Sequence, residues 1–222
     1  MSEQNLNRFL EDGKIWFSRA DIFGDKMECV RIKDIAKARH DFKTIEARKR
    51  KFLISCWHLA DRESLVLWDT HSKLAEDRRT VAIRFDSHDL ITMIKDAAIK
   101  NHNNLFYKTE FTHGRAVYRE LIGADLKLLM DMAVKEPSFR KEEAFRYENE
   151  YRFVIKLASE HSTNGYSYSL NTAVGQQPFK IIVNPLLESN DYLPLKHRIE
   201  KTQFADKLIQ SDLAGWLHPE LW

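Results

Sequence analysis

Two glutamates, Glu148 and Glu150, stand one residue apart where a charged stretch of the sequence gives way to a run of β-forming residues. If both belonged to a strand, the two-residue alternation of side chains would place their carboxylates close together on one face. Paired carboxylates are typical of sites where one group holds a substrate hydroxyl while the other handles a proton. The pair is therefore either part of an active site or a solvated sheet edge that Arg146, Arg152 and Lys156 neutralise.

The elements expected around this pair mix short strands with helices and show no regular β-α-β alternation. This order predicts an α+β fold with mixed, mostly antiparallel sheets and surrounding helices. Runs of β-branched and aromatic residues predict strands over 13–18, 51–57, 81–86, 115–120, 150–158 and 179–185. Apolar spacing and helix-start signals predict helices over 31–51, 63–77, 88–101, 126–135, 138–148 and 199–210.

The length of 222 residues favours a single domain over 1–222, with a catalytic-like core followed by a C-terminal helical tail over 194–222. Hydrophobic residues make up 43% and charged residues 31%, as in globular proteins rather than extended disorder. The opening is polar and no stretch is apolar enough for a membrane span, so we expect a cytoplasmic protein with no membrane partner. The two cysteines, Cys29 and Cys56, lack metal-binding spacing, which predicts reduced thiols and no metal site.

The predicted helix over 31–51 is strongly basic, with nine Lys or Arg against three Asp or Glu, whereas the net charge of the whole chain is only +2. Such a run is usually a solvated helix face. It is also the local charge asymmetry expected of a protein that contacts phosphate backbones. On that alternative, the candidate nucleic-acid-binding residues are Lys49, Arg50 and Lys51.

Two further positions can be weighed with the glutamates: Arg19, at the end of the first predicted strand, and Ser55, inside the apolar stretch FLISCW. Their order resembles the arginine-serine-glutamate class of ADP-ribosyltransferases. In that class an early strand ends with arginine, a middle strand carries serine, and a Glu/Gln-x-Glu loop precedes a later strand. The resemblance implies an ADP-ribosyltransferase-like fold and the use of NAD.

The same stretches also resemble a broader family of uncharacterised bacterial and phage domains. The shared segments are WFSRADIFGDKMEC, ISCWH with Trp68 downstream, the tyrosine-bearing strand AVY and the signature YENEYR. This second resemblance spans most of the first 155 residues and implies no activity by itself.

The resemblance to the transferases implies a role for each candidate residue. Glu150 would bind ribose hydroxyls and stabilise the oxocarbenium-like state that forms when nicotinamide leaves NAD. Glu148 would position or deprotonate the acceptor. Arg19, with Ser18 beside it, would bind NAD, because the arginine fork can hold a phosphate or ribose oxygen in a fixed geometry.

Two residues of the middle strand complete the expected NAD site. Ser55 would donate or accept a supporting hydrogen bond, and Trp57 would flank the nicotinamide. Each has a structural alternative, since serines in apolar strands commonly bond to neighbouring backbone and large aromatics dominate cores. Arg19 likewise can pair with Asp21 or Asp25.

We therefore expect a mono-ADP-ribosyltransferase that modifies a macromolecule, with RNA as one candidate acceptor. A toxin or phage-defence setting would suit it, and an antitoxin protein would then neutralise it. The alternative is a non-enzymatic nucleic-acid- or protein-binding module, in which the glutamates are structural and the basic helix is the interface.

Overall fold

The computed structural model describes residues 1–25, 28–31, 42–74, 79–101, 110–120, 137–170 and 172–217. The chain divides into two compact units. The first unit comprises Met1–Lys14, Ala60–Ala97 and Ser169–Trp222, and the second comprises Ile15–Leu59 and Ala98–Tyr168. The predicted helix over 126–135 and residues 32–41 of the basic helix lie outside the described residues. The single domain expected over 1–222 stays a prediction.

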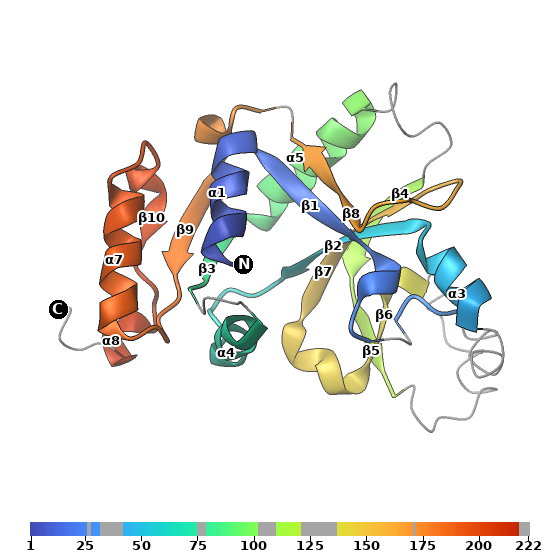
Figure 1. The fold of residues 1–222 in the computed structure, drawn as a ribbon, viewed down its shortest axis with the longest axis horizontal. Helices are drawn as coiled ribbons and strands as arrows, with labels where there is room; N and C mark the ends of the chain where they lie inside the picture. The colour runs from blue at the N-terminus through green and yellow to red at the C-terminus, as the bar shows by residue number, and fades with distance from the viewer. Residues whose placement is uncertain are drawn as a thin grey trace. The chain divides into compact units, whose positions relative to one another are not determined.

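The second unit is built on a five-stranded sheet in the order β4-β7-β2-β1-β8 (Figure 1). The β1–β2, β2–β7 and β4–β7 pairs are antiparallel. Tyr, Phe, Val and Ile in β7 favour its place between β4 and β2, where most of its side chains are buried. The strand bounds are β1 Lys14–Arg19, β2 Phe52–His58, β4 Glu110–Arg115, β7 Glu150–Lys156 and β8 Gly165–Ser169.

The register of this sheet divides its side chains between two faces. His58 lies opposite Glu150, and Cys56 lies opposite Arg152. Directly paired residues project from the same side of a sheet, and alternate residues of a strand share a side. These four side chains therefore share one face, which we call the glutamate face.

Short elements surround the glutamate face. On its apolar half, Ala20, Cys29, Ile54 and Val154 form a buried cluster, and Phe139 packs against it. Near its charged half, β5 and β6 pair in parallel as a two-stranded ribbon, and η3 connects β6 to β7. The bounds are η1 Ala20–Ile22, α3 Phe42–Lys49, β5 Val117–Arg119, η2 Pro137–Phe139, β6 Arg140–Glu142 and η3 Glu143–Glu148.

The first unit packs helices around a three-stranded sheet in the order β10-β9-β3. β3 is antiparallel to β9, and the short β10 is parallel to it. Phe9, Phe85, Phe179 and Phe204 form a chain of ring contacts with centroids 5.1 to 6.4 Å apart. The bounds are α1 Glu3–Asp12, α4 Leu65–Leu74, β3 Val81–Phe85, α5 Ser87–Asn101, η4 Val174–Gln176, β9 Phe179–Val183, α7 Ser189–Glu200, η5 Ala205–Lys207, β10 Leu208–Ile209 and α8 Ala214–Leu217.

The described residues thus form mixed α+β structure with mostly antiparallel sheets, as the sequence predicted. Among these residues, no helix is long and apolar enough to cross a membrane.

The predicted helix over 138–148 is wrong, because this stretch forms β6 and η3. Arg140 and Lys141 are buried rather than solvated. Arg140 donates to the Val30 carbonyl oxygen, and Lys141 donates to glutamate carboxylates. These contacts hold Arg140 and Lys141 in the extended conformation of β6, which outweighs the local preference of the charged residues for helix.

The predicted helix over 199–210 is also wrong, since α7 spans Ser189–Glu200 and the residues after it form η5 and β10. Pro194 indicates against a helix over 189–200, because it lies in the interior of α7 and proline cannot donate a backbone hydrogen bond. Tyr192, Leu195 and Ile199 are buried along the same helix. Their packing compensates for the backbone hydrogen bond that proline cannot donate.

Gly165, the first residue of β8, has no room for a side chain. A Cβ atom there would meet the carbonyl oxygen of Phe17 and the ring of Trp16. We expect Gly165→Ala to lower the free energy of unfolding by about 1–3 kcal/mol, because backbone atoms would have to shift. Denaturant unfolding measures this change. Gly24→Ala is the control, since nothing lies within 4 Å of its Cβ position, and an equal loss in both variants would contradict the prediction.

Candidate active site

The two glutamates lie on different elements, although their carboxylates meet. Glu148 ends η3, Asn149 has a left-handed φ of 40°, and β7 begins at Glu150. The two glutamates therefore do not share a strand, because Asn149 turns the chain between them. Lys141 brings the carboxylates together instead: its Nζ donates to Glu148 Oε2 and, over 3.1 Å, to Glu150 Oε1.

Arg152 holds the other side of the Glu150 carboxylate. Its side chain is fully buried, and its Nε and Nη2 lie 2.7 and 2.5 Å from Glu150 Oε2. Nη2 also donates to Glu28, and Nη1 donates to the Ser138 carbonyl oxygen over 2.7 Å. The guanidinium thus ties the segment around Glu28 and η2 to the start of β7.

The β5–β6 ribbon fixes the backbone of Glu150 as well as its carboxylate. Tyr118 of β5 lies opposite Lys141 of β6 in the parallel register. The Tyr118 hydroxyl accepts the Glu150 N–H over 2.8 Å, and the Ala116 N–H donates to the Glu150 carbonyl oxygen over 2.8 Å. Glu150 is therefore held at its N–H, its carbonyl oxygen and its side chain.

This cluster contains three carboxyl groups and two cations: Glu28, Glu148, Glu150, Lys141 and Arg152. Burial raises the pKa of Glu148 to about 7, and the hydrogen bond with Glu150 adds to this rise. Burial acts in the same direction on Glu150, but Arg152, the hydrogen bond from Glu148 and Lys141 outweigh it and lower the Glu150 pKa. Glu148 therefore holds a proton below neutral pH while Glu150 is ionised.

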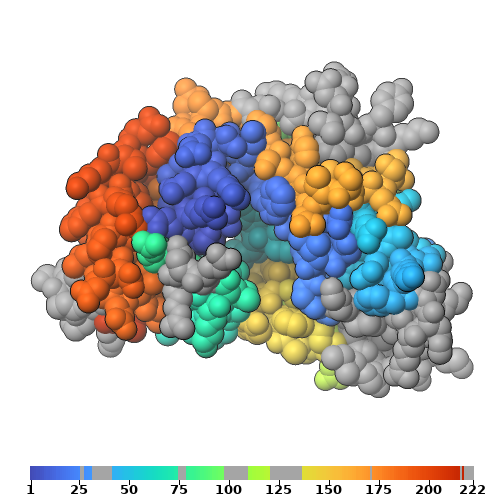
Figure 2. Space-filling model, in the orientation of Figure 1, coloured from blue at the N-terminus to red at the C-terminus, as the bar shows by residue number. Residues whose placement is uncertain are grey.

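Two carboxyl groups whose surroundings push their pKa values apart provide a protonated and an ionised form side by side. Such a pair can transfer protons and stabilise a developing positive charge. The side chain of Glu148 is 20% exposed and that of Glu150 is 10% exposed. Figure 2 shows the yellow segment that includes η3 on the face of the molecule in view, and of the two glutamates Glu148 is the more exposed.

The register separates two candidate NAD-binding residues from the glutamates. Ser55 lies opposite Phe153 and Trp57 lies opposite Tyr151, so both project from the face of the sheet away from Glu150. There, Trp57 Nε1 donates to Ser55 Oγ over 3.1 Å. The structure does not bring this pair to the carboxylates.

Arg19 also projects from that opposite face, because it lies opposite Leu53. Its Nε and Nη2 donate to the two carboxylate oxygens of Asp21 over 2.5 and 3.0 Å. Its Nη1 donates to the carbonyl oxygens of His161 and Thr163, each over 2.9 Å. Both ends of the guanidinium are thus engaged within the protein, in the structural pairing with Asp21 that was the alternative to phosphate binding.

Ser18 differs from these three candidates, since it lies opposite Ile54 and projects from the glutamate face. Its Oγ accepts the Trp16 Nε1–H over 3.0 Å. Ser18 shares a face with Glu150, but β2 lies between their strands.

The three candidate nucleic-acid-binding residues contact protein atoms. Lys49 is only 2% exposed. Arg50 lies 3.4 Å from Asp21 and 3.6 Å from Glu160, and Lys51 Nζ donates to a backbone carbonyl oxygen over 3.3 Å. Nucleic-acid binding by these residues stays a prediction, and the burial of Lys49 weakens its part in it.

Sequence analysis did not identify Glu28, Lys141 or Tyr118 as members of the site. Glu28 and Tyr118 fall in WFSRADIFGDKMEC and AVY, two segments of the second resemblance, and that was the available signal. Lys141 had none, because a lysine within FRKEEAF has the pattern of any surface charge. Arg152 was expected to neutralise the glutamates at a solvated sheet edge. It does pair with Glu150, but its side chain is fully buried.

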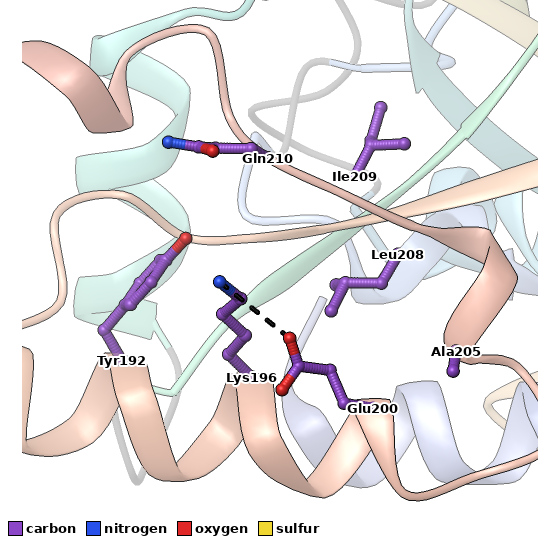
Figure 3. Close-up of a pocket in the computed structure, with 7 residues that line it drawn as sticks. All are labelled: Tyr192, Lys196, Glu200, Ala205, Leu208, Ile209 and Gln210. Carbon is purple, nitrogen blue, oxygen red and sulfur yellow. Dashed lines mark ion pairs between the residues drawn. The ribbon is translucent and has the colours of Figure 1, made fainter. Parts of the chain in front are cut away.

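The first unit has a pocket of about 230 Å³ that none of the candidate residues lines. Lys196 Nζ and Glu200 Oε1 lie 3.8 Å apart in its wall. Among the described residues, no group of three His, Cys, Asp or Glu side chains is arranged to hold a metal ion. Figure 3 shows the lining residues of the pocket: Tyr192, Lys196, Glu200, Ala205, Leu208, Ile209 and Gln210.

Comparison of the chain with family models, curated proteins and solved structures gives no match. The two family resemblances therefore stay hypotheses that rest on the quoted segments.

The proton on Glu148 makes stability depend on pH. Its pKa of about 7 lies above the ordinary value of 4.5, so its stabilisation is fully present below pH 4.5 and is lost as the pH rises through about 7. Gln cannot titrate, so we expect the melting temperature of Glu148→Gln, relative to the parent, to increase between about pH 5 and about pH 8. Thermal unfolding followed by circular dichroism measures this difference.

Glu143→Gln is the matched control for this experiment, because Glu143 lies in the same η3. Its hydrogen bond with Arg146 lowers its pKa, so its charge does not change over this pH window. Suppose that the melting-temperature difference between Glu148→Gln and the parent is as independent of pH as that of Glu143→Gln. That result would contradict the conclusion that Glu148 is protonated below neutral pH.

Proposed function

We propose that the second unit carries a mono-ADP-ribosyltransferase, which moves ADP-ribose from NAD to a macromolecular acceptor. The observation that carries this proposal is the Glu150 carboxylate held between Lys141 and Arg152, beside Glu148, whose pKa burial raises to about 7. A carboxylate held in a largely dry site stabilises positive charge without reorganising at the moment of reaction. The ribose of NAD develops such a charge when nicotinamide departs.

In the proposed reaction, the bond between ribose C1′ and the nicotinamide nitrogen breaks, and its electron pair neutralises the ring. The Glu150 carboxylate stabilises the oxocarbenium-like ribose and accepts hydrogen bonds from its hydroxyls. An acceptor atom then bonds to C1′ and loses its proton. Glu148 is the more exposed of the two glutamates, and it positions the acceptor.

The glutamate face suits the ribose of NAD better than its diphosphate. Glu150 offers carboxylate oxygens for ribose hydroxyls, whereas Lys141 and Arg152 are already paired with glutamates. Arg19, the expected phosphate ligand, is bound to Asp21. The proposal therefore rests on recognition of the ribose and assigns no residue to the diphosphate.

RNA is our candidate acceptor, on the support of the basic sequence over 31–51. A toxin or phage-defence role, with a neutralising partner protein, belongs to the same proposal. A second candidate function is a non-enzymatic binding module. One observation favours it: each charged group of the cluster has a partner of opposite charge inside the protein, as a purely structural network requires.

Two matched variants separate these functions. Glu28→Gln and Glu150→Gln each remove one carboxylate from Arg152, and both residues are buried, with 5% and 9% exposure. Breaking a buried ion pair costs up to about 3–5 kcal/mol, so we expect both variants to be destabilised. We expect Glu150→Gln alone to lose NAD cleavage, by roughly a hundredfold or more, because only Glu150 faces the ribose.

Nicotinamide release from labelled NAD is measured at a temperature where both variants are folded by circular dichroism. Similar losses of cleavage in the two variants would contradict a catalytic Glu150 and favour the binding module. Cleavage by Glu150→Gln at the parent rate would also remove Glu150 from the reaction.

A further inference from the structure

The turn between the two glutamates is fastened to the end of β2 by three hydrogen bonds. The Leu59 N–H donates to the Asn149 carbonyl oxygen over 2.9 Å, and Asn149 Nδ2 donates to the Leu59 carbonyl oxygen. Beside them, His58 Nδ1 lies 2.7 Å from the Glu148 carbonyl oxygen. His58 is also the residue opposite Glu150, so it shares the glutamate face.

The Glu148 carbonyl oxygen sets the tautomer of the His58 ring. A carbonyl oxygen only accepts, so Nδ1 carries the proton, and Nε2 of the neutral ring keeps a lone pair. His58 is exposed, and its Nε2 has no hydrogen-bond partner among the described residues. An imidazole that is anchored at one nitrogen and open at the other has the arrangement of a general base.

We propose that His58 is a catalytic residue, the general base that removes the proton from the acceptor. This inference rests on the proposed transferase function. His58 Nε2 takes the proton of the acceptor hydroxyl or amine as the acceptor atom bonds to ribose C1′, and later passes it to water. The bond from C1′ to nicotinamide breaks in the same transfer, and its electron pair stays on the ring nitrogen.

Position favours His58 over Glu148 for this proton transfer. Glu148 Oε2 is bound to Lys141 and the Glu148 carboxyl group is hydrogen-bonded to Glu150, so it is directed into the cluster, whereas His58 Nε2 is open within the described part of the chain. Residues directly opposite in an antiparallel pair have Cβ atoms about 4.5–5.5 Å apart, which sets His58 beside Glu150. An acceptor that approaches a ribose bound at Glu150 therefore comes within reach of Nε2.

A second histidine of the same sheet provides a matched control. His113 of β4 also has its Nδ1 in a hydrogen bond, 2.6 Å from the Tyr151 hydroxyl. It lies opposite Phe153 and so projects from the face away from Glu150. His113 is thus a histidine of the same sheet with its Nδ1 in a hydrogen bond, but on the face away from the proposed reaction.

His58→Asn separates the base from its anchor. The Asn amide can donate from the position of Nδ1, which keeps the contact with the Glu148 carbonyl oxygen, but it has no counterpart of Nε2. With NAD as the substrate and water as the acceptor, we expect kcat to fall by about a hundredfold and KM to change little. We expect His113→Asn to retain the parent rate.

Azide distinguishes a lost base from a damaged fold. Azide ion attacks C1′ without giving up a proton, so it needs no base. We expect added azide to restore most of the NAD cleavage by His58→Asn, with ADP-ribosyl azide as the product, and to accelerate the parent and His113→Asn far less. Circular dichroism confirms that each variant is folded under the assay conditions.

Three outcomes would overturn this inference. Parent-like hydrolysis of NAD by His58→Asn would do so and leave the proposed function standing. A low rate that azide does not restore would show that His58 is structural. Absence of NAD cleavage in the parent protein would overturn the transferase function and the role of His58 with it.

Discussion

The buried guanidinium of Arg152 is the interaction on which the second unit depends. A cation without solvent exposure is strongly unfavourable unless each of its sides is paired. Glu150, Glu28 and the Ser138 carbonyl oxygen supply those partners, and they come from three separate parts of the chain. The elements around the glutamate face must therefore assemble together. If one of them were missing, part of the buried Arg152 guanidinium would have no partner.

The partners that gather around Arg152 leave the cluster with more carboxyl groups than cations. Three carboxyl groups face two cations, so in a poorly solvated site one carboxyl group keeps its proton to higher pH than usual. Arg152 and Lys141 hold Glu150 ionised, and the proton remains on Glu148. The same network of ion pairs therefore places a protonated and an ionised carboxyl group side by side. Burial, together with the excess of carboxyl groups over cations, thus explains the raised pKa of Glu148 within this network.

The sequence was sufficient for β1, β2, β3, β7 and β9 and for singling out the glutamate pair, but it missed β4 and β8 of the larger sheet and most of the site around the glutamates. Short runs of apolar, β-branched and aromatic residues located β2 and β7, since most side chains in the middle of both strands are buried. Glu28 was not predictable in this way, because its partner Arg152 lies more than a hundred residues away in the sequence. Lys141 was not predictable either, because it lies in the short β5–β6 ribbon, which has no sequence pattern of its own. The left-handed Asn149 turns the chain between Glu148 and the strand; asparagine adopts this conformation more readily than most residues, but a single asparagine does not specify it.

The register of β2 on β7 explains most of the remaining difference between the predicted site and the site in the structure. Ser55 and Trp57 lie in the expected strand, but the pairing of Ser55 with Phe153 turns them away from Glu150, whereas Cys56 and His58 turn toward it. Residues that act on one substrate must share a face, so an arginine-serine-glutamate arrangement cannot form on one side of this sheet. If the chain transfers ADP-ribose, its chemistry therefore comes from the groups of the glutamate face, and the order of motifs along the sequence is a weaker guide to the site than the register of β2 on β7.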